Sequence, residues 1–390
     1  MGDTRGVDEV GARLEPWRPG SLDLHHLATG RGDATLVVGT DGSTLLIDAG
    51  AVAEHVATQV PARPDTSRRP GEWVARYVRR RLAETGRRRL DQALITHLHP
   101  DHFGGADASD VREPGGRYRL TGISDVDAAV GIDRLVDVDH PDYGYPPFEG
   151  RDHCANYLAY VGARVERGER VERFVVGSAT QLRLGDVEVR NLAARGRVWS
   201  GTGDGVHDVF PPREQLAPAD YPTENAGSAA VRLRLGDFTY FAAGDLTDSA
   251  DAGTRPWMDA GTPAARAAGR VSVAVAAHHG GFDACGPGTV AALAPRVWVV
   301  SSWHASHPSN ATLYRLLHRR LYPGPREVYL TELADAARVV LSPRLRAVAS
   351  QGGHVVVRVD PGGSAFRVVV TDHRDEQDTV TLVRGPYPGR

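Results

Sequence analysis

Apolar and polar positions repeat along the chain with two different periods, and these predict different elements. Short apolar runs bounded by Gly, Asp and Pro predict two or three strands in 21–50 and single strands at 91–96, 171–176, 180–192, 228–235, 240–243, 271–277 and 297–301. Apolar residues at helical spacing predict helices at 73–84, 152–165 and 310–321. Strands that alternate with helices in this way are typical of an α/β fold.

The end of the chain predicts a separate β tail. Valine-rich runs at 355–359 and 366–370 flank the sequence Asp-Pro-Gly-Gly, which favours a hairpin turn, and a third run follows at 379–383. We therefore expect one main domain over 21–345 and a β-strand extension over 346–390 that packs on the same domain.

Residues from about 110 to 222 separate two groups of predicted core strands, which indicates an inserted subdomain. Loops on a rigid scaffold commonly carry specificity, so the insertion is expected to form part of a pocket wall. A merely structural flap is the alternative. The side chains that could line the pocket are His140, Tyr143, Tyr145, Phe148 and Trp199.

The charge composition argues against a protein that grips duplex nucleic acid. The formal net charge of the 390 residues is −3, and all 46 basic residues are arginines. Nonspecific binding to duplex nucleic acid normally requires a strong basic excess or stripe. The arginines at 79–81 and 87–89 are read as a solvated face, and the Ala, Gly and Arg richness as a trait of a high-GC genome. The oligomeric state is not determined by these patterns.

Other features of composition indicate a cytoplasmic protein. No apolar run approaches the roughly 18–20 residues that span a bilayer, and residues 1–20 contain no apolar segment typical of a secretion signal. Cys154 and Cys285 are the only cysteines, and they lie far apart in sequence. Two such thiols favour a reducing compartment.

Four metal-binding side chains fall within six residues. The sequence Thr-His-Leu-His-Pro-Asp-His-Phe-Gly-Gly at 96–105 contains His97, His99, Asp101 and His102. From a strand that ends in a tight loop, the first two histidines project on one face, and the other two side chains reach toward a second point. Imidazole and carboxylate are common ligands of zinc and related cations, so the loop predicts two neighbouring divalent ions. A polar loop rich in histidine is the alternative.

This motif resembles that of the metallo-β-lactamase superfamily of hydrolases, and three further motifs resemble it in the same order. These are Asp48 after the strand Leu-Leu-Ile, Asp245 after Phe-Ala-Ala-Gly, and His307 before a proline. The resemblance implies an αββα sandwich and two metal ions, most simply zinc. It further implies that Asp48 orients a ligand histidine, that Asp245 bridges the metals, and that His307 is the last ligand.

Shorter segments are similar to the soluble hydrolase domain of ComEC-type proteins, which accompanies DNA-uptake channels. They contain Gly-Arg-Gly-Asp ending at Asp33, Glu-Asn-Ala-Gly-Ser with Asn225 and Ser228, the pair His278 and His279 before two glycines, and His304. The resemblance implies that four of these residues support the metal ligands or contact substrate: Asp33, Asn225, Ser228 and His304. No membrane channel accompanies these segments, so DNA transport is not implied.

One position departs from the family pattern. Many superfamily members have a histidine about twenty residues before the bridging aspartate, where this chain has Asn225; the nearest upstream histidine is His207. The site of His97 and His99 could therefore use an amide oxygen or water, and such an oxygen-richer site also accepts manganese. Alternatively, Asn225 caps a turn.

The motifs predict a dinuclear metal-dependent hydrolase in which Asp101 helps to orient the attacking water. In the superfamily phosphodiesterase ribonuclease Z, an extra histidine near the positions of His278 and His279 is associated with protonation of the leaving group, which favours phosphodiesters of nucleic acids or nucleotides. Alternatively, one of this pair is a metal ligand or packs beneath the site. Hydrolysis of a small-molecule ester, lactone, amide or thioester is the second hypothesis. A non-catalytic, metal-poor binding protein is the third.

Overall fold

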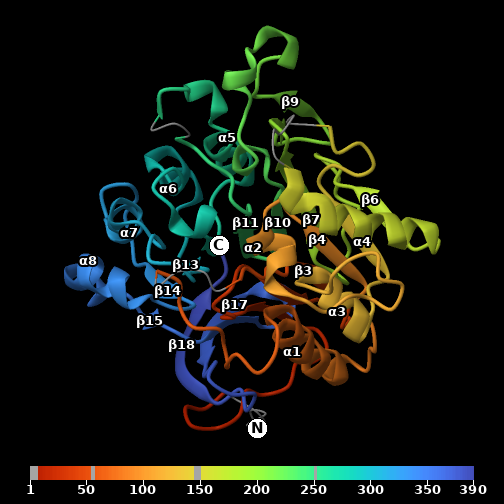
Figure 1. Ribbon diagram of the computed structural model, residues 1–390. Helices are drawn as coiled ribbons and strands as arrows, with labels where there is room; N and C mark the ends of the chain where they lie inside the picture. Colours follow the sequence, from red (N-terminus) through yellow and green to blue (C-terminus); the bar gives the residue numbers. More distant parts are fainter. Residues whose placement is uncertain (1–7, 54–57, 145–150, 250–252) are drawn as a thin grey trace.

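Two large β-sheets lie face to face at the centre of the molecule, and helices cover the outer side of each sheet (Figure 1). The computed structural model describes residues 8–53, 58–144, 151–249 and 253–390, and within these ranges each sheet has nine strands. The predicted α/β sandwich of two mixed sheets is confirmed.

The first sheet contains segments from both ends of the chain. In spatial order its strands are β18 (Val380–Pro388), β17 (Ala365–Thr371), β16 (His354–Val359), β1 (Leu22–His26), β2 (Thr35–Val38), β3 (Thr44–Ile47), β4 (Gln92–Ile95), β5 (Arg134–Asp137) and β6 (Arg170–Arg173). β16 pairs antiparallel with β1, whereas β3 to β6 run parallel. The C-terminal strands thus extend the first sheet beyond β1, with β16 to β18 forming its far edge.

The second sheet is parallel on one side and antiparallel on the other. In spatial order its strands are β15 (Ser350–Gln351), β14 (Glu327–Leu330), β13 (Val297–Val300), β12 (Val273–Val275), β11 (Phe238–Ala242), β10 (Ala230–Leu235), β7 (Glu188–Ala194), β8 (Arg197–Trp199) and β9 (Val206–Asp208). Strands β11 to β15 run parallel, and β10 pairs antiparallel with both β11 and β7. Residues 110–222, expected to form an insertion, contribute strands to both sheets.

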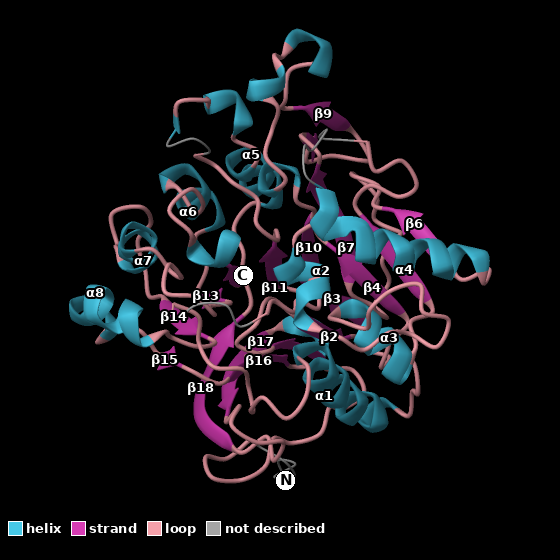
Figure 2. Ribbon diagram, viewed as in Figure 1, coloured by secondary structure: helices cyan, strands magenta, loops and turns pink. Residues whose placement is uncertain are grey.

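The helices divide between the two outer faces (Figure 2). They are α1 (Pro70–Thr85), α2 (Pro100–Phe103), α3 (Ile123–Val130), α4 (Ala155–Glu166), α5 (Gly261–Ala268), α6 (Pro287–Leu293), α7 (Asn310–Leu317) and α8 (Asp335–Leu345). The helices expected at 73–84 and 152–165 are confirmed as α1 and α4. The helix expected at 310–321 ends four residues early, because His318 adopts an extended conformation. In the described part of the chain, no helix is both long and apolar enough to cross a membrane.

Local sequence explains how α1 begins and ends. Pro70 occupies the first helical position, where its missing N–H costs no hydrogen bond. The Glu72 carboxylate accepts a hydrogen bond from the backbone N–H of Arg69 at 3.0 Å. Gly86 then ends the helix in the left-handed conformation, with φ 73°.

Alternate residues of the central strands face different layers. In β13, Val297 and Val299 belong to the apolar core between the sheets, whereas Trp298 and Val300 pack in the core beneath the helices α5 to α8. Because both faces of the strand are buried, the sequence is apolar at every position instead of alternating. This explains why the central strands appear as continuous apolar runs.

Candidate metal centre

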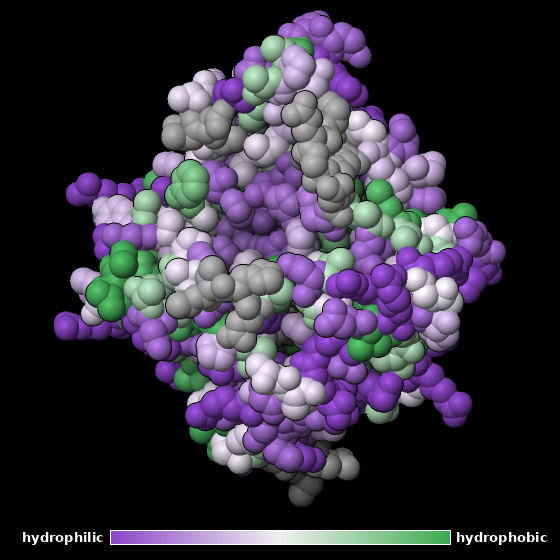
Figure 3. All heavy atoms as spheres, viewed as in Figure 1, coloured by the Kyte–Doolittle hydropathy of each residue, from purple (hydrophilic) through white to green (hydrophobic). Residues whose placement is uncertain are grey.

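Six side chains that can bind a metal gather beyond the ends of strands from both sheets. The loop after β4 and the short helix α2 supply four of them, and the segments after β11 and β12 supply one each; they are His97, His99, Asp101, His102, Asp245 and His279. The carboxyl ends of parallel strands are a common place for binding sites in α/β folds. Figure 3 shows a hollow between α6 and α4 with hydrophilic residues at its bottom.

Four of these residues form cluster A, which consists of Asp101, His102, Asp245 and His279. Their ligand atoms all lie within 4.8 Å of one another. Nε2 of His279 lies 3.0 Å from Oδ2 of Asp101 and 3.5 Å from Oδ2 of Asp245. Nε2 of His102 lies 3.2 Å from Oδ1 of Asp245. Two carboxylates and two imidazoles thus surround one small volume.

Cluster B consists of His97, His99 and, again, Asp245, whose ligand atoms also lie within 4.8 Å of one another. Nε2 of His97 lies 3.2 Å from Nδ1 of His99 and 3.7 Å from Oδ2 of Asp245. Asp245 is therefore common to both clusters. A carboxylate that bridges two cations requires this arrangement.

The hydrogen-bond partners of each histidine show which ring nitrogen carries the proton and which one is left to bind a cation. Nδ1 of His102 lies 2.8 Å from the Asp48 carboxylate, so this nitrogen carries the proton and Nε2 presents a lone pair. That lone pair faces Oδ1 of Asp245, and both atoms are buried without a hydrogen-bond partner. Two buried acceptors that face each other fit a cation between them.

The ring of His279 has its proton on Nδ1 for the same reason. Its Nδ1 lies 3.1 Å from the carbonyl oxygen of Ser301 and 3.1 Å from Oδ1 of Asp33, and both of these oxygens are acceptors. Nε2 consequently presents its lone pair to the carboxylates of Asp101 and Asp245. Cluster A therefore fits a divalent cation at both of its imidazoles.

Asp48 orients one histidine of each cluster through the ring nitrogen that does not face the other ligands. Its carboxylate accepts hydrogen bonds from Nδ1–H of His102 at 2.8 Å and from Thr96 Oγ1 at 2.7 Å. The same hydroxyl oxygen lies 3.2 Å from Nδ1 of His97, which leaves Nε2 of that ring free to bind a metal. A buried partner that fixes the tautomer of a ligand histidine is typical of metal sites.

Burial and charge shift the pKa values of these groups in opposite directions. Burial lowers the pKa of His97 well below its usual value. Burial also opposes the charged form of His102 and His279, but nearby carboxylates, Asp245 foremost, outweigh it and raise the pKa of both imidazoles well above the usual value. The carboxylates that favour the charged form of these imidazoles would equally favour a cation bound between them.

His278 lies beside the clusters and has a different partner. Its Nδ1 is 2.6 Å from Oδ1 of Asp283, and its Nε2 is 3.8 Å from Oδ2 of Asp245. His278 and His279 both have positive φ, 50° and 52°, which is strained for a non-glycine residue. This backbone turns consecutive side chains toward different partners, and strain of this kind concentrates at functional sites.

The last histidine differs from the sequence-based expectation. His307, expected as a ligand, is outside both clusters, and His279 occupies that place in cluster A. The His307 ring instead stacks on the His279 ring, with centroids 4.5 Å apart, and its Nδ1 is buried without a hydrogen-bond partner. The backbone of His278 and His279, with positive φ at both residues, brings the His279 ring to 3.0 Å from Asp101.

The remaining expected residues lie around the clusters. Ser228 Oγ accepts a hydrogen bond from the backbone N–H of Asp245 at 3.2 Å. Nδ2 of Asn225 lies 3.1 Å from Nε2 of His278, and its Oδ1 is buried without a partner. Nε2 of His304 lies 2.8 Å from Thr58 Oγ1, while His207 is exposed on the edge strand β9.

A buried ion-pair network that the sequence did not reveal fixes the metal-binding loop. Oε1 of Glu224 accepts a hydrogen bond from the backbone N–H of Leu98, which lies between His97 and His99. Arg195 holds Glu224 at 2.7 Å and Asp139 at 2.6 Å. Residues 110–222 thus anchor the loop. The position of Glu224 directly before Asn225 was the only available signal.

The aromatic residues expected in the pocket wall do not share one location. Trp199 is only 6% exposed, and its Nε1 donates a hydrogen bond to the Gly203 carbonyl oxygen, which favours the alternative of a structural role for this ring. The Tyr143 hydroxyl donates to Asp137, and His140 lies beside Tyr143. Tyr145 and Phe148 lie outside the described residues. The insertion contributes His153 instead, whose ring centroid is 6.1 Å from that of His99.

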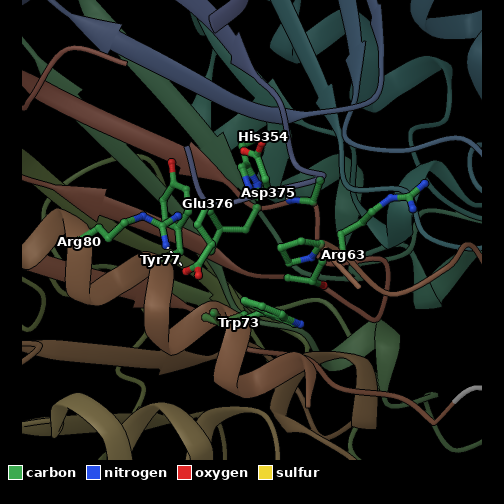
Figure 4. A pocket seen from close by; sticks show the side chains of 12 residues that line it. Arg63, Trp73, Tyr77, Arg80, His354, Asp375 and Glu376 are labelled. Atoms are coloured by element: carbon green, nitrogen blue, oxygen red, sulfur yellow. Dashed lines mark hydrogen bonds and ion pairs between the residues drawn. The ribbon is translucent and has the colours of Figure 1, made fainter. Parts of the chain in front are cut away.

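A small cavity between α1 and the first sheet is separate from this centre (Figure 4). Its volume of about 20 Å³ is close to that of one water site. Its polar groups are paired: Arg80 binds Glu376, and Nδ1 of His354 accepts a hydrogen bond from the backbone N–H of Ala28. We interpret this cavity as a packing feature.

Comparison with known proteins supports part of this picture. Residues 28–112 match the model of the Metallo-beta-lactamase superfamily. No curated protein matches the sequence. Two similar solved structures are a mutant of the CmlA beta-hydroxylase, at 12% identity and a TM-score of 0.40, and the diiron beta-hydroxylase CmlA from Streptomyces venezuelae, at 14% identity and a TM-score of 0.39. They cover 88% and 89% of this chain, whereas the chain spans only 54% and 55% of their lengths.

The matched segment contains Asp48 and four members of the two clusters, His97, His99, Asp101 and His102. The two large sheets of the α/β fold are consistent with the sandwich of this superfamily. Closeness to ComEC-type proteins is not among these findings. Residues 28–112 thus match a metallo-beta-lactamase superfamily domain. The candidate metal ligands of this segment lie beyond the carboxyl end of strand β4.

Proposed function

We propose that this protein is a metal-dependent hydrolase with a dinuclear centre. The observation that carries the proposal is the shared carboxylate: Asp245 belongs to two clusters of inward-facing ligand atoms. Cluster A would hold one cation through Asp101, His102 and His279. Cluster B would hold the other through His97 and His99. Nitrogen and carboxylate donors of this kind suit zinc, and manganese is the second candidate.

Two divalent cations supply Lewis-acid polarisation of the scissile bond and activation of water at neutral pH. The chain's own residues provide orientation. Asp48 fixes the imidazole of His102, and Ser301 with Asp33 fixes that of His279. Asp101, a member of cluster A, would accept a hydrogen bond from the attacking water and orient it.

His278 is the candidate proton donor to the leaving group. Hydrolysis adds water across a bond: its oxygen joins the phosphoryl or acyl centre, and one proton goes to the departing oxygen, nitrogen or sulfur. Asp283 holds Nδ1 of His278, and Nε2 lies 3.8 Å from Oδ2 of Asp245 and 3.1 Å from Nδ2 of Asn225, at the edge of the clusters. A positioned imidazole of this kind provides about 10²–10⁴-fold in rate. His279, the other member of the pair, is assigned as a ligand.

The substrate class has two candidates. A phosphodiester, with an alkoxide that needs a proton, makes full use of His278. An ester, lactone, amide or thioester in small-molecule metabolism is the second, and the net charge of −3 favours it because it gives no excess of positive charge for nucleic acid. A non-catalytic binding protein would not need the oriented pair of His278 and Asp283.

Metal analysis combined with a substrate screen tests this function. We expect about two divalent ions per chain, and hydrolysis of nitrophenyl phosphodiesters or esters that chelation abolishes and zinc or manganese restores. Asp245→Asn should lose metal and activity together. Asp110→Asn, at a fully exposed carboxylate, is the matched control and should retain both. Two bound ions without hydrolysis of any compound in the screen would favour the binding protein.

A further inference from the structure

An apolar groove opens beside the metal centre. Its volume is about 330 Å³, at the lower end of the range of small-molecule sites. Its apolar lining comes from the segments before α6 and α7 and from α8: Phe282, Ala305, Pro308, Ala337, Val340 and Leu341. No Asp, Glu or Arg is among the described residues that line it. Figure 3 shows apolar side chains over α8 at the left edge of the molecule.

One end of the groove reaches the candidate catalytic residues. His278 and His307 line it, His278 Nε2 lies 3.8 Å from Asp245, and the His307 ring stacks on His279. Phe282 lies on the loop between His278 and the Asp283 that holds it, and 67% of its surface is exposed. Most of the surface of this large apolar side chain is thus open to solvent at the edge of the groove.

We propose that this groove binds an apolar substituent of a small-molecule substrate, on the leaving-group side of the scissile bond. The proposal rests on the proposed function, because the side is assigned through His278. If His278 gives its proton to the departing atom, the leaving group must lie next to His278, and the groove is the space that continues from it. Beyond His278 and His307, no ionisable side chain is among the described lining residues. This disfavours a nucleic acid chain along the groove, because its further phosphates would lose hydration without a compensating cation.

Substrates with a lengthening leaving group test the groove. In a series of esters and phosphodiesters with a fixed acid part and alcohols from methyl to hexyl, we expect kcat/KM to rise by up to about fourfold per methylene, the factor for complete burial. Lengthening the acid part instead should have a smaller effect. An equal effect on both sides would overturn the assignment to the leaving group.

Two neighbouring valines of α8 provide a matched pair of variants. Val340 lines the groove and is 61% exposed, whereas Val339 is 80% exposed and is not part of the lining. Val340→Glu should remove the dependence on alcohol length by placing a charge in the groove, and Phe282→Ala should weaken it. Val339→Glu adds the same charge and should leave the dependence unchanged. Equal loss in both glutamate variants would overturn the proposal.

A binding measurement separates this proposal from the proposed function. We expect 4-phenylbutanol to bind wild-type protein in NMR titrations, and Val340→Glu to weaken binding about tenfold or more. Binding of the alcohol without hydrolysis of any compound would support the groove as an apolar binding site and contradict the proposed hydrolase function. Hydrolysis that shows neither length dependence nor alcohol binding would contradict the groove proposal and support the hydrolase function. A dimer in analytical ultracentrifugation that both glutamate variants dissociate would make the surface a self-interface and overturn the proposal.

Discussion

The His307 ring lies against the His279 ring, with centroids 4.5 Å apart and planes inclined by 25°. Of these two rings, it is that of His279 whose Nε2 lies close to both Asp101 and Asp245, at 3.0 and 3.5 Å. The stack makes His307 a neighbour that covers the ligand ring and limits its rotation. The two histidines should therefore respond differently to substitution, although both lie at the same edge of the fold.

The first prediction concerns this pair. His279→Ala should remove about one metal ion per chain, because it deletes a ligand of cluster A. His307→Ala should keep both ions and lower the affinity about 10–100-fold, the usual effect of removing a supporting neighbour. Metal content by elemental analysis after dialysis checks both. Full occupancy in His279→Ala together with loss in His307→Ala would restore the assignment expected from the sequence.

The second prediction concerns Asp48. Its carboxylate accepts a hydrogen bond from Nδ1–H of His102 and, through Thr96, orients His97. Asp48→Asn should weaken the binding of both ions by about 10–100-fold, because the correct tautomers are no longer enforced. Thr96→Val should affect mainly the ion of cluster B. Competition with a chromogenic chelator measures both affinities. Unchanged affinity in Asp48→Asn would make its role purely structural.

The part of the site that comes from one short segment could be predicted from the sequence, because residues this close in the chain are also close in the fold. His97, His99, Asp101 and His102 follow one strand within six residues, so their proximity requires no knowledge of the rest of the fold. Apolar runs likewise predicted the central strands, because a strand buried on both faces is apolar throughout.

The choice between His279 and His307 could not be predicted in the same way. Both follow parallel strands of the second sheet, and they lie 28 positions apart in the sequence. Which one reaches Asp101 depends on the backbone of His278 and His279, whose positive φ values have no signal in these residue types. The salt bridge between Arg195 and Glu224 could not be predicted either, because it joins segments that are adjacent only after folding.

The third prediction tests how tightly the metal loop is packed. A Cβ atom added at Gly50 would lie 1.8 Å from the carbonyl oxygen of Asp101, which is well inside contact distance. Gly50→Ala should displace the loop, lower metal affinity by at least about tenfold, and destabilise the protein. In Gly162→Ala, within α4, the new Cβ meets nothing within 4 Å. That control should gain about 0.5–1 kcal/mol in unfolding free energy and bind metal normally.

The fourth prediction concerns the metal-free protein. Although burial lowers the pKa of His279, Asp245 and other carboxylates raise it well above the usual 6.5. A raised folded-state pKa stabilises the protein fully below the unfolded-state pKa, and this contribution disappears as the pH rises through the folded-state pKa. The difference in unfolding free energy between metal-free wild type and His279→Gln should therefore be largest near pH 6 and shrink toward pH 10.

Urea unfolding in the presence of a chelator measures this difference. The control is His207→Gln, at an exposed position on β9 that is outside both clusters. It should show no such trend with pH. A difference for His279→Gln that grows between pH 6 and 10 would mean that the neutral ring is favoured in the folded protein.

The last prediction concerns His278 as the proton donor to the leaving group. Nδ1 of His278 lies 2.6 Å from Asp283, while Nε2 faces the space before Asp245. His278→Ala should reduce the rate about 10²–10⁴-fold for substrates with alkoxide leaving groups. The loss should shrink with nitrophenolate, because this anion departs without a proton. Asp283→Asn should show a smaller loss with the same dependence, and metal content should stay at the wild-type level in both. An equal rate loss for good and poor leaving groups, accompanied by lost metal, would make His278 a ligand of cluster B, because its Nε2 is as close to Asp245 as that of His97.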